Sequence, residues 1–179
     1  MKNCGLSELR LVEPREKWPN DGANSMAAGA DDILQNIKVF DNIPSALSDV
    51  IHVFSLTARN RDITKIELGP DYAAKKIYEN STKSEKSAIL FGPEQSGLTN
   101  DEIAYSNFLV KVPMVENFSS LNLSQAVLLM SWEWRKLFLK NYLSENGYKK
   151  ISEPQLSHKT PLSTAQERDY FFSRLEKFL

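Results

Sequence analysis

The sequence predicts an α/β fold in which a mainly parallel sheet lies between layers of helices. Short runs rich in β-branched and aromatic residues alternate with segments of helical pattern along most of the 179-residue chain. Several short runs are apolar at successive positions, as in the segment AILF at 88–91. A strand without polar alternation is expected to be buried on both faces, which is typical of parallel sheets covered by helices.

The individual elements follow in chain order. We expect strands over 8–12, 36–40, 50–56, 87–92 and 107–113. Helices are expected between them, over 22–30, 43–49, 69–80 and 99–106. Pro70 suits a first helical turn, where its missing N–H leaves no bond unmade. Thr99 followed by Glu102 fits a capping box at the start of the fourth helix.

The last third of the chain predicts one long helix and one short one. Apolar residues recur at helical spacing over about five turns: Leu123, Val127, Met130, Trp134, Leu137 and Phe138. A polar stretch follows, and Ser163 with Gln166 fits the start of a final helix. We therefore divide the chain into a domain at 1–145, a linker at 146–162 and a C-terminal helix at 163–179.

Composition excludes several classes of protein. A net charge of −1 does not fit a polycation made for nucleic acid, although a local basic face remains possible. The single cysteine, Cys4, rules out an internal disulfide, and His52 and His158 give no zinc-like spacing. No apolar run approaches the roughly 18 residues of a membrane span. We expect a cytoplasmic protein that uses no metal and binds no membrane.

Two loops at the carboxyl ends of predicted strands carry groups suited to ligand binding. Arg59 and Arg61 follow the strand at 50–56 and can bind phosphate bidentately, although a solvated turn has the same composition. Glu94 lies between Gly92 and Gly97, which is either a ligand site or ordinary turn chemistry. Neither loop has the glycine pattern of a P-loop or of a dinucleotide site.

A third cluster, FSSLNLS at 118–124, precedes the long apolar helix. A helix cap would explain one hydroxyl, of Ser119 or Ser120. It does not explain Asn122 and Ser124 at the start of a helix built for burial. Buried polar groups need partners, so the cluster predicts a bound ligand or another loop held against the helix start.

These three segments together resemble the motifs of a known family. TARNR at 57–61, ILFGPEQSGLTNDE at 89–102 and the stretch at 112–134 resemble, in order and spacing, SpoU/TrmH-type RNA ribose 2'-O-methyltransferases of the SPOUT superfamily. The segments 1–15 and 27–34 are most similar to its TrmJ-like branch. The resemblance implies a deep C-terminal trefoil knot, S-adenosylmethionine as cofactor, tRNA or rRNA as substrate, and a homodimer.

The resemblance also implies roles for particular residues. Glu94, Asn122 and Ser120 would organise the catalytic end of the site. With RNA as the substrate, the phosphate-binding candidates Arg59 and Arg61 would contact RNA. The protein would align a ribose 2'-hydroxyl with the methyl group and ease removal of its proton. Cofactor contacts would come from Leu56, Thr57, Ala58, Gly92, Val112, Ser119, Ser120 and Leu121.

One family motif has no counterpart here. Members carry an upstream strand, an Asn-x-Gly turn and a helix with an arginine, whereas this sequence begins with MKNCGL, which resembles the last turn of that helix with Gly5 as its stop. We therefore expect reduced stability and weak or absent methyl transfer from the chain as it stands.

Two other functions remain open at this stage. One is a knotted dimer that binds RNA or cofactor without catalysis, and the other is a flavodoxin-like or other nucleotide-binding α/β protein with coincidental motifs. A local basic face for RNA would be formed by Arg10, Arg15, Lys17, Arg59, Arg61 and Lys65, or these residues are scattered surface charge.

Overall fold

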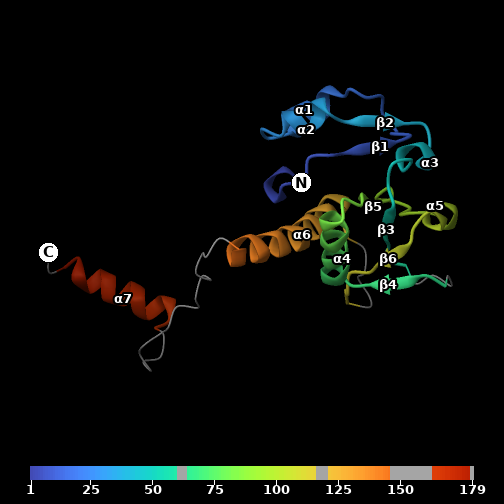
Figure 1. Ribbon diagram of the computed structural model, residues 1–179. Coiled ribbons are helices and arrows are strands. Elements are labelled where there is room, and N and C mark those ends of the chain that lie inside the picture. The colour runs from blue at the N-terminus through green and yellow to red at the C-terminus, as the bar shows by residue number, and fades with distance from the viewer. Residues whose placement is uncertain (60–63, 116–120, 146–162, 178–179) are drawn as a thin grey trace. The chain divides into compact units, whose positions relative to one another are not determined.

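A computed structural model describes residues 1–59, 64–115, 121–145 and 163–177. The chain divides into two compact units, Met1–Asn146 and Gly147–Leu179 (Figure 1). The helix described in the second unit is α7 (Ala165–Leu175). The linker predicted at 146–162 lies outside the described residues.

The first unit contains a four-stranded parallel sheet of order β4-β6-β3-β5. Its strands are β3 (His52–Leu56), β4 (Ile66–Leu68), β5 (Ser87–Leu90) and β6 (Phe108–Val110). Phe54 in β3 lies opposite Ile89 on one side and Phe108 on the other. Neighbouring strands in this sheet are never consecutive in sequence, so each pairing depends on a crossover connection.

A separate two-stranded parallel sheet joins β1 (Arg10–Val12) to β2 (Lys38–Phe40). All five predicted strands are therefore confirmed, but they fall into two sheets rather than one. The strand β4 was not predicted, because it has only three residues and both Ile66 and Glu67 are exposed. The sequence Ile66-Glu67-Leu68 does alternate, but three residues are too few for the alternation to indicate a strand.

The predicted helices of the first unit begin within one residue of the predicted positions, but those predicted at 22–30 and 43–49 end earlier, at Met26 and Ala46. The helices of this unit are the 3-10 helix η1 (Lys2–Cys4) and the α-helices α1 (Asp21–Met26), α2 (Asp31–Gln35), α3 (Ile43–Ala46), α4 (Pro70–Thr82), α5 (Asn100–Ala104) and α6 (Leu123–Glu145). Pro70 is the first residue of α4, and Thr99 with Glu102 forms the predicted capping box of α5. Gly5 ends η1 with a φ of 81°, as its place after MKNC predicts.

The start of the last helix was predicted one residue too early. Its capping box uses Thr164 and Glu167, not Ser163 and Gln166. Both pairs have the required spacing, but a carboxylate accepts a backbone hydrogen bond more strongly than a neutral amide oxygen. The helix α2 was also not predicted as a separate element.

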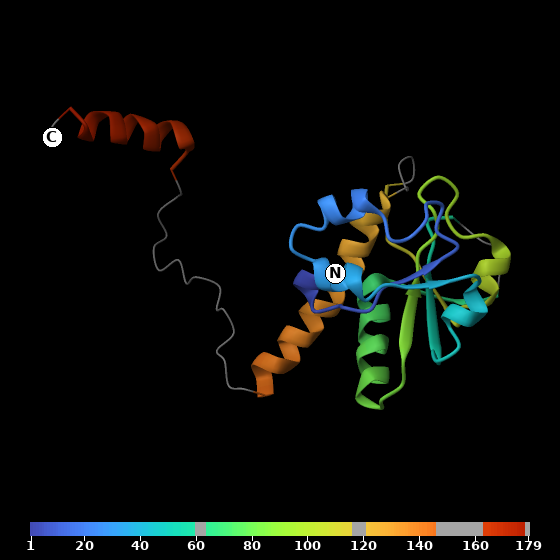
Figure 2. The same ribbon diagram turned by 90° about the horizontal axis from the view of Figure 1, so that it is seen from above.

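The larger sheet is covered on both faces, as the apolar strands predict. Figure 2 shows α4 and α6 on one side of it and α5 on the other. Phe54 and Val110 pack with Ala73 of α4 and Met130 of α6, and all four are buried. Leu109, the alternate residue of β6, packs instead with Leu98 and Ile103 on the α5 side. Along α6 the predicted apolar stripe is only partly correct, because Phe138 is 41% exposed.

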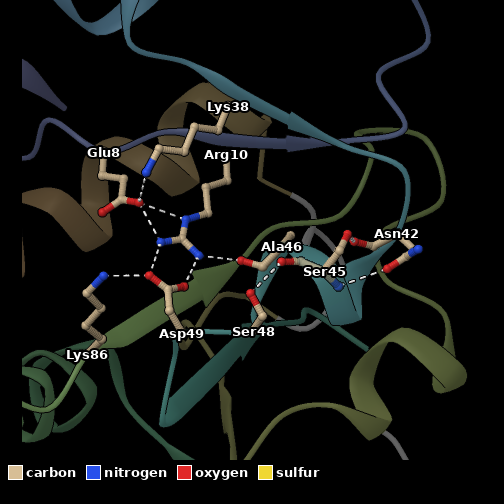
Figure 3. Close-up of polar contacts among 9 residues, drawn as sticks. All are labelled: Glu8, Arg10, Lys38, Asn42, Ser45, Ala46, Ser48, Asp49 and Lys86. Atoms are coloured by element: carbon tan, nitrogen blue, oxygen red, sulfur yellow. Dashed lines mark hydrogen bonds and ion pairs between the residues drawn. The ribbon is translucent and has the colours of Figure 1, made fainter.

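An ionic cluster connects the smaller sheet to the larger one (Figure 3). The Arg10 guanidinium of β1 donates to Glu8 Oε1 at 2.9 Å, to Asp49 Oδ2 at 3.0 Å and to the carbonyl of Ala46. Lys86, next to the first residue of β5, donates to the same Asp49 carboxylate. Since no ladder of the described residues joins the two sheets, these bonds are a principal polar link between them.

Candidate functional site

A cavity of about 600 Å³ opens at the carboxyl ends of three adjacent strands, β5, β3 and β6. This edge is where open parallel sheets collect ligands, and the volume suits a small organic molecule. The loops after these strands and the first turn of α6 line it: Leu56, Thr57, Ala58, Arg59, Phe91, Gly92, Pro93, Glu94, Gln95, Ser96, Gly97, Leu98, Val112, Leu121, Leu123 and Ala126.

The loop after β5 folds tightly on itself. The N–H of Gly97 donates to the carbonyl of Pro93 at 2.7 Å, and Gly97 has a φ of 63°. A Cβ added to Gly92 would lie 2.3 Å from the backbone carbon of Gly97 and 2.3 Å from the backbone nitrogen of Leu98. Only glycine fits at position 92, because the backbone of Gly97 and Leu98 folds back into the space that a side chain would need.

The loops after β3 and β6 are joined directly. The N–H of Thr57 donates to the carbonyl of Val110 at 3.1 Å, which extends the strand pairing into the cavity wall. The Thr57 hydroxyl accepts from the N–H of Arg59 at 3.3 Å and turns the chain outward. Thr57 is buried while Arg59 is exposed, so the turn separates a closed wall from a solvent-facing cation.

The start of α6 is bonded to the loop after β5. Asn122 Nδ2 donates to Glu94 Oε1 at 2.9 Å. Asn122 Oδ1 accepts from the backbone N–H of Ser124 at 2.9 Å and from its hydroxyl at 2.5 Å. The first helical bond, from the N–H of Ala126 to the carbonyl of Asn122, identifies Asn122 as the N-cap. One side chain thus caps the helix and holds a carboxylate at the cavity.

The structure brings most of the predicted site residues to this one place. Glu94, Arg59 and six of the expected cofactor contacts line the cavity: Leu56, Thr57, Ala58, Gly92, Val112 and Leu121. Asn122 reaches it through Glu94. Ser119, Ser120 and Arg61 lie outside the described residues.

Several lining residues were missed by the sequence analysis. Pro93, Gln95, Ser96 and Leu98 belong to the same tight loop as Glu94, and a loop between two glycines was the available signal. Leu123 and Ala126 gave no signal, because apolar side chains at the start of an apolar helix are indistinguishable from core residues.

The predicted basic face is wrong at two positions. Arg10 is only 15% exposed and is occupied by Glu8 and Asp49. Lys65 Nζ donates to the carbonyls of Ile103, Ala104 and Ser106 at the end of α5, and burial lowers the pKa of this amine. Both side chains serve the fold, which leaves less positive charge for a substrate.

Within the described part of the chain, no group of three or more His, Cys, Asp or Glu side chains is arranged to hold a metal ion. None of the helices described has the length and apolar character that a membrane crossing requires.

Residues 1–132 match the model of the SpoU rRNA Methylase family. The chain belongs to this family. It is 36% identical over its whole length to the tRNA (cytidine/uridine/adenosine-2'-O-)-methyltransferase TrmJ of Pseudomonas aeruginosa, of which it covers 69%. This similarity supports a place in the TrmJ-like branch of the SpoU family.

Solved structures agree with this SpoU assignment. The crystal structure of TrmJ from Z. mobilis is 41% identical with a TM-score of 0.72, over 83% of this chain and 72% of that one. A probable methylase family protein from Haemophilus influenzae is 32% identical with a TM-score of 0.73, over 98% and 68%. The chain spans about two thirds of the curated relatives that it matches.

Proposed function

We propose that this chain binds S-adenosylmethionine in the cavity and transfers its methyl group to a ribose 2'-hydroxyl of tRNA. The observation that carries the proposal is the meeting of the Gly92 loop with Thr57, Val112 and Leu121 beside the bonded pair Asn122 and Glu94. Membership of the SpoU family and the similarity to TrmJ proteins supply the reaction and the RNA class.

The residues present fit such a cofactor. Apolar side chains of Leu56, Val112 and Leu121 offer a surface for a flat base, and Gly92 lies in the cavity wall within a tightly folded loop. Backbone N–H and C=O groups of these loops can supply donors and acceptors for the cofactor. We assign the cofactor contacts to these loops, together with Ser119 and Ser120.

The cofactor, when bound, supplies an electrophilic methyl group on a sulfonium. The protein's part is to hold the 2'-hydroxyl in line and to favour loss of its proton. We assign this part to Glu94, Asn122 and Ser120. The Asn122 amide fixes one Glu94 oxygen and thereby orients the carboxylate at the cavity.

Further features of the proposal follow from the family. We propose that Arg59 and Arg61 bind phosphate of the RNA. Arg59 is exposed and lies two residues after the buried Thr57, whose hydroxyl accepts from the Arg59 N–H. We also propose a trefoil-knotted path through 112–124 and a cytoplasmic homodimer. Leu128 and Trp132 on α6, which are 59% and 50% exposed, favour a second copy as the partner of that helix.

The decisive experiment combines calorimetry with tritium transfer. Titration of the protein with S-adenosylmethionine measures cofactor binding, and transfer of label from its methyl group to bulk tRNA measures the reaction. The position of the methylated ribose in the tRNA is then determined by nuclease mapping of the labelled nucleotide. Binding without transfer would indicate a non-catalytic module, and absence of both would refute the proposal.

A further inference from the structure

We propose that Ser124 is a positioning residue that fixes the Asn122 amide toward Glu94. This inference rests on the proposed function, because it assigns a role within that catalytic end. Ser124 lies on the first turn of α6, and its two donors converge on the single oxygen Asn122 Oδ1. Ser124 does not line the cavity, so we assign it a role only through Asn122.

The chemistry of the partners allows only one orientation of the amide. The backbone N–H of Ser124 can only donate, so the Asn122 atom that faces it must be the oxygen. An ionised Glu94 carboxylate can only accept, so the atom that faces it must be the NH2 group. The two ends of the amide therefore require the same orientation, and Ser124 holds the end away from the cavity.

The hydroxyl is the part of Ser124 that adds to an ordinary helix cap. A cap needs only the bond from the backbone N–H, which any residue at position 124 would make. Elsewhere on the described helices serine hydroxyls donate to carbonyls of the preceding turn, as Ser131 does to Val127 and Ser81 does to Tyr78. Ser124 instead donates to the side chain that reaches Glu94, 28 residues away in sequence.

A second donor on Oδ1 limits rotation of the Asn122 side chain. With both bonds present, turning the amide away from Glu94 breaks three hydrogen bonds at once. Without the hydroxyl, the cap remains but the amide is held by one bond fewer. A neutral hydrogen bond is worth about 1 kcal/mol, which corresponds to roughly a fivefold change in rate if it is expressed in the transition state.

Kinetics of three variants test the proposal. Ser124→Ala should lower kcat for methyl transfer about fivefold or more while the KM for S-adenosylmethionine stays within about twofold. Ser124→Thr keeps the hydroxyl and should restore kcat. Ser81→Ala, which removes a hydroxyl from the exposed end of α4, is the matched control and should leave both constants unchanged.

A double substitution separates positioning from a structural role. If Ser124 acts through Asn122 on Glu94, then Ser124→Ala should have no further effect on kcat in a Glu94→Ala background, where the acceptor of the Asn122 amide is absent. A residue that merely stabilises α6 would lower kcat by the same factor in both backgrounds. Equal factors would therefore overturn the inference.

A readout that needs no activity keeps this test distinct from that of the proposed function. The side-chain NH2 signals of Asn122 in a 15N-labelled protein are identified by their disappearance in Asn122→Asp. In Ser124→Ala these signals should move toward free-amide positions and exchange faster with water, while Ser124→Thr should leave them in place. Unchanged signals in Ser124→Ala would overturn the inference, whether or not the wild-type protein transfers methyl groups.

Discussion

The loop after β5 has no space for one added carbon at Gly92. The conflict of an alanine Cβ there is with backbone atoms of Gly97 and Leu98, so no rotamer change relieves it. Gly92→Ala should lower the free energy of unfolding by about 1–3 kcal/mol. Because the loop must shift to admit the methyl group, the free energy of S-adenosylmethionine binding, measured by calorimetry, should lose more than the free energy of unfolding does.

Gly29→Ala is the control for this substitution. Gly29 has a φ of 84° with nothing within 4 Å of an added Cβ, so its cost is conformational rather than steric. It should lower stability by about 1–2 kcal/mol without changing cofactor affinity. Retained affinity in Gly92→Ala would show that the loop does not contact the cofactor.

Asn122 can be changed so that its hydrogen bond to Glu94 becomes a repulsion while its bonds to Ser124 are kept. In Asn122→Asp the oxygen that accepts from Ser124 remains, but a second carboxylate replaces the NH2 group 2.9 Å from Glu94 Oε1. Two neighbouring carboxylates raise the pKa of the pair, so repulsion is greatest above neutral pH. Methyl transfer at pH 8 should fall at least about tenfold and recover in part as the pH is lowered.

The pH–rate profile measures this effect directly. Asn42→Asp changes another helix cap, at α3, where Asn42 Oδ1 accepts from the N–H of Ser45 at 2.9 Å. That control should keep the wild-type profile. A profile of Asn122→Asp parallel to the wild type at all pH values would contradict an interaction between Asn122 and Glu94 in the active protein.

The sequence was sufficient to predict many of the residues that belong to the site, but not which of them contact one another. Gly92 and Glu94 stood out because a carboxylate between glycines after a strand is chemically distinctive. The bond from Asn122 to Glu94 joins residues 28 positions apart, and no spacing rule predicts such a pair. The resemblance to a family placed both residues in one site, whereas periodicity alone would have left them in unrelated loops.

At the scale of the element, two identical capping boxes allow a paired test. Thr99 Oγ1 accepts from the N–H of Glu102 at 3.2 Å, and Thr164 Oγ1 accepts from the N–H of Glu167 at 3.2 Å. Thr99→Ala should lower the free energy of unfolding by about 1 kcal/mol, because α5 carries the fully buried Ile103.

Thr164→Ala should not alter that transition. The helix α7 belongs to the second unit, and its described residues are exposed. Urea unfolding followed by tryptophan fluorescence reports on the first unit, which holds Trp18, Trp132 and Trp134. An equal loss in both variants would mean that the two units unfold together.

Elements with strong local signals were predicted, and elements defined by their neighbours were not. Pro70 and Thr99 mark helix starts by their own chemistry, so α4 and α5 were placed within about two residues. The strand β4 exists because its residues pair with Phe108–Val110 of β6. Such pairing is a tertiary property, and three largely exposed residues do not encode it.

At the scale of the whole molecule, the ionic cluster around Arg10 makes stability depend on acidity. Arg10, followed by Lys86, holds the pKa of Asp49 below its ordinary value of 3.8. Arg10 also lowers the pKa of Glu8 from 4.5. The unfolded chain therefore binds protons at a higher pH than the folded one. The stabilisation is fully present at pH 7 and is lost as the pH falls below about 4.5 through the lowered values.

Asp49→Asn tests this link between the sheets. It should reduce the free energy of unfolding at pH 7 and flatten its decline between about pH 5 and pH 2, measured by urea unfolding at each pH. Glu79→Gln removes an exposed pair with Lys75 on α4, at 3.9 Å, and should change stability by less than about 0.5 kcal/mol. A wild-type slope in Asp49→Asn would exclude Asp49 as its source.

The division of the strands into two sheets could not be predicted from the sequence. Runs such as those at 8–12 and 36–40 predict strands but do not indicate which sheet each strand joins. Their separation is a matter of which backbone edges meet, and the polar link through Arg10 and Asp49 spans 39 positions. Strand type was therefore predictable, while strand partnership was not.

The strand order β4-β6-β3-β5 has a consequence for how the chain is made. No pair in this sheet can close as a hairpin, so contacts form only between distant segments, which slows folding. During synthesis β3, β4 and β5 leave the ribosome before β6, the strand that must enter between β4 and β3. The cavity wall from α6 arrives later still. The proposed cofactor site can therefore form only after most of the first unit has been translated.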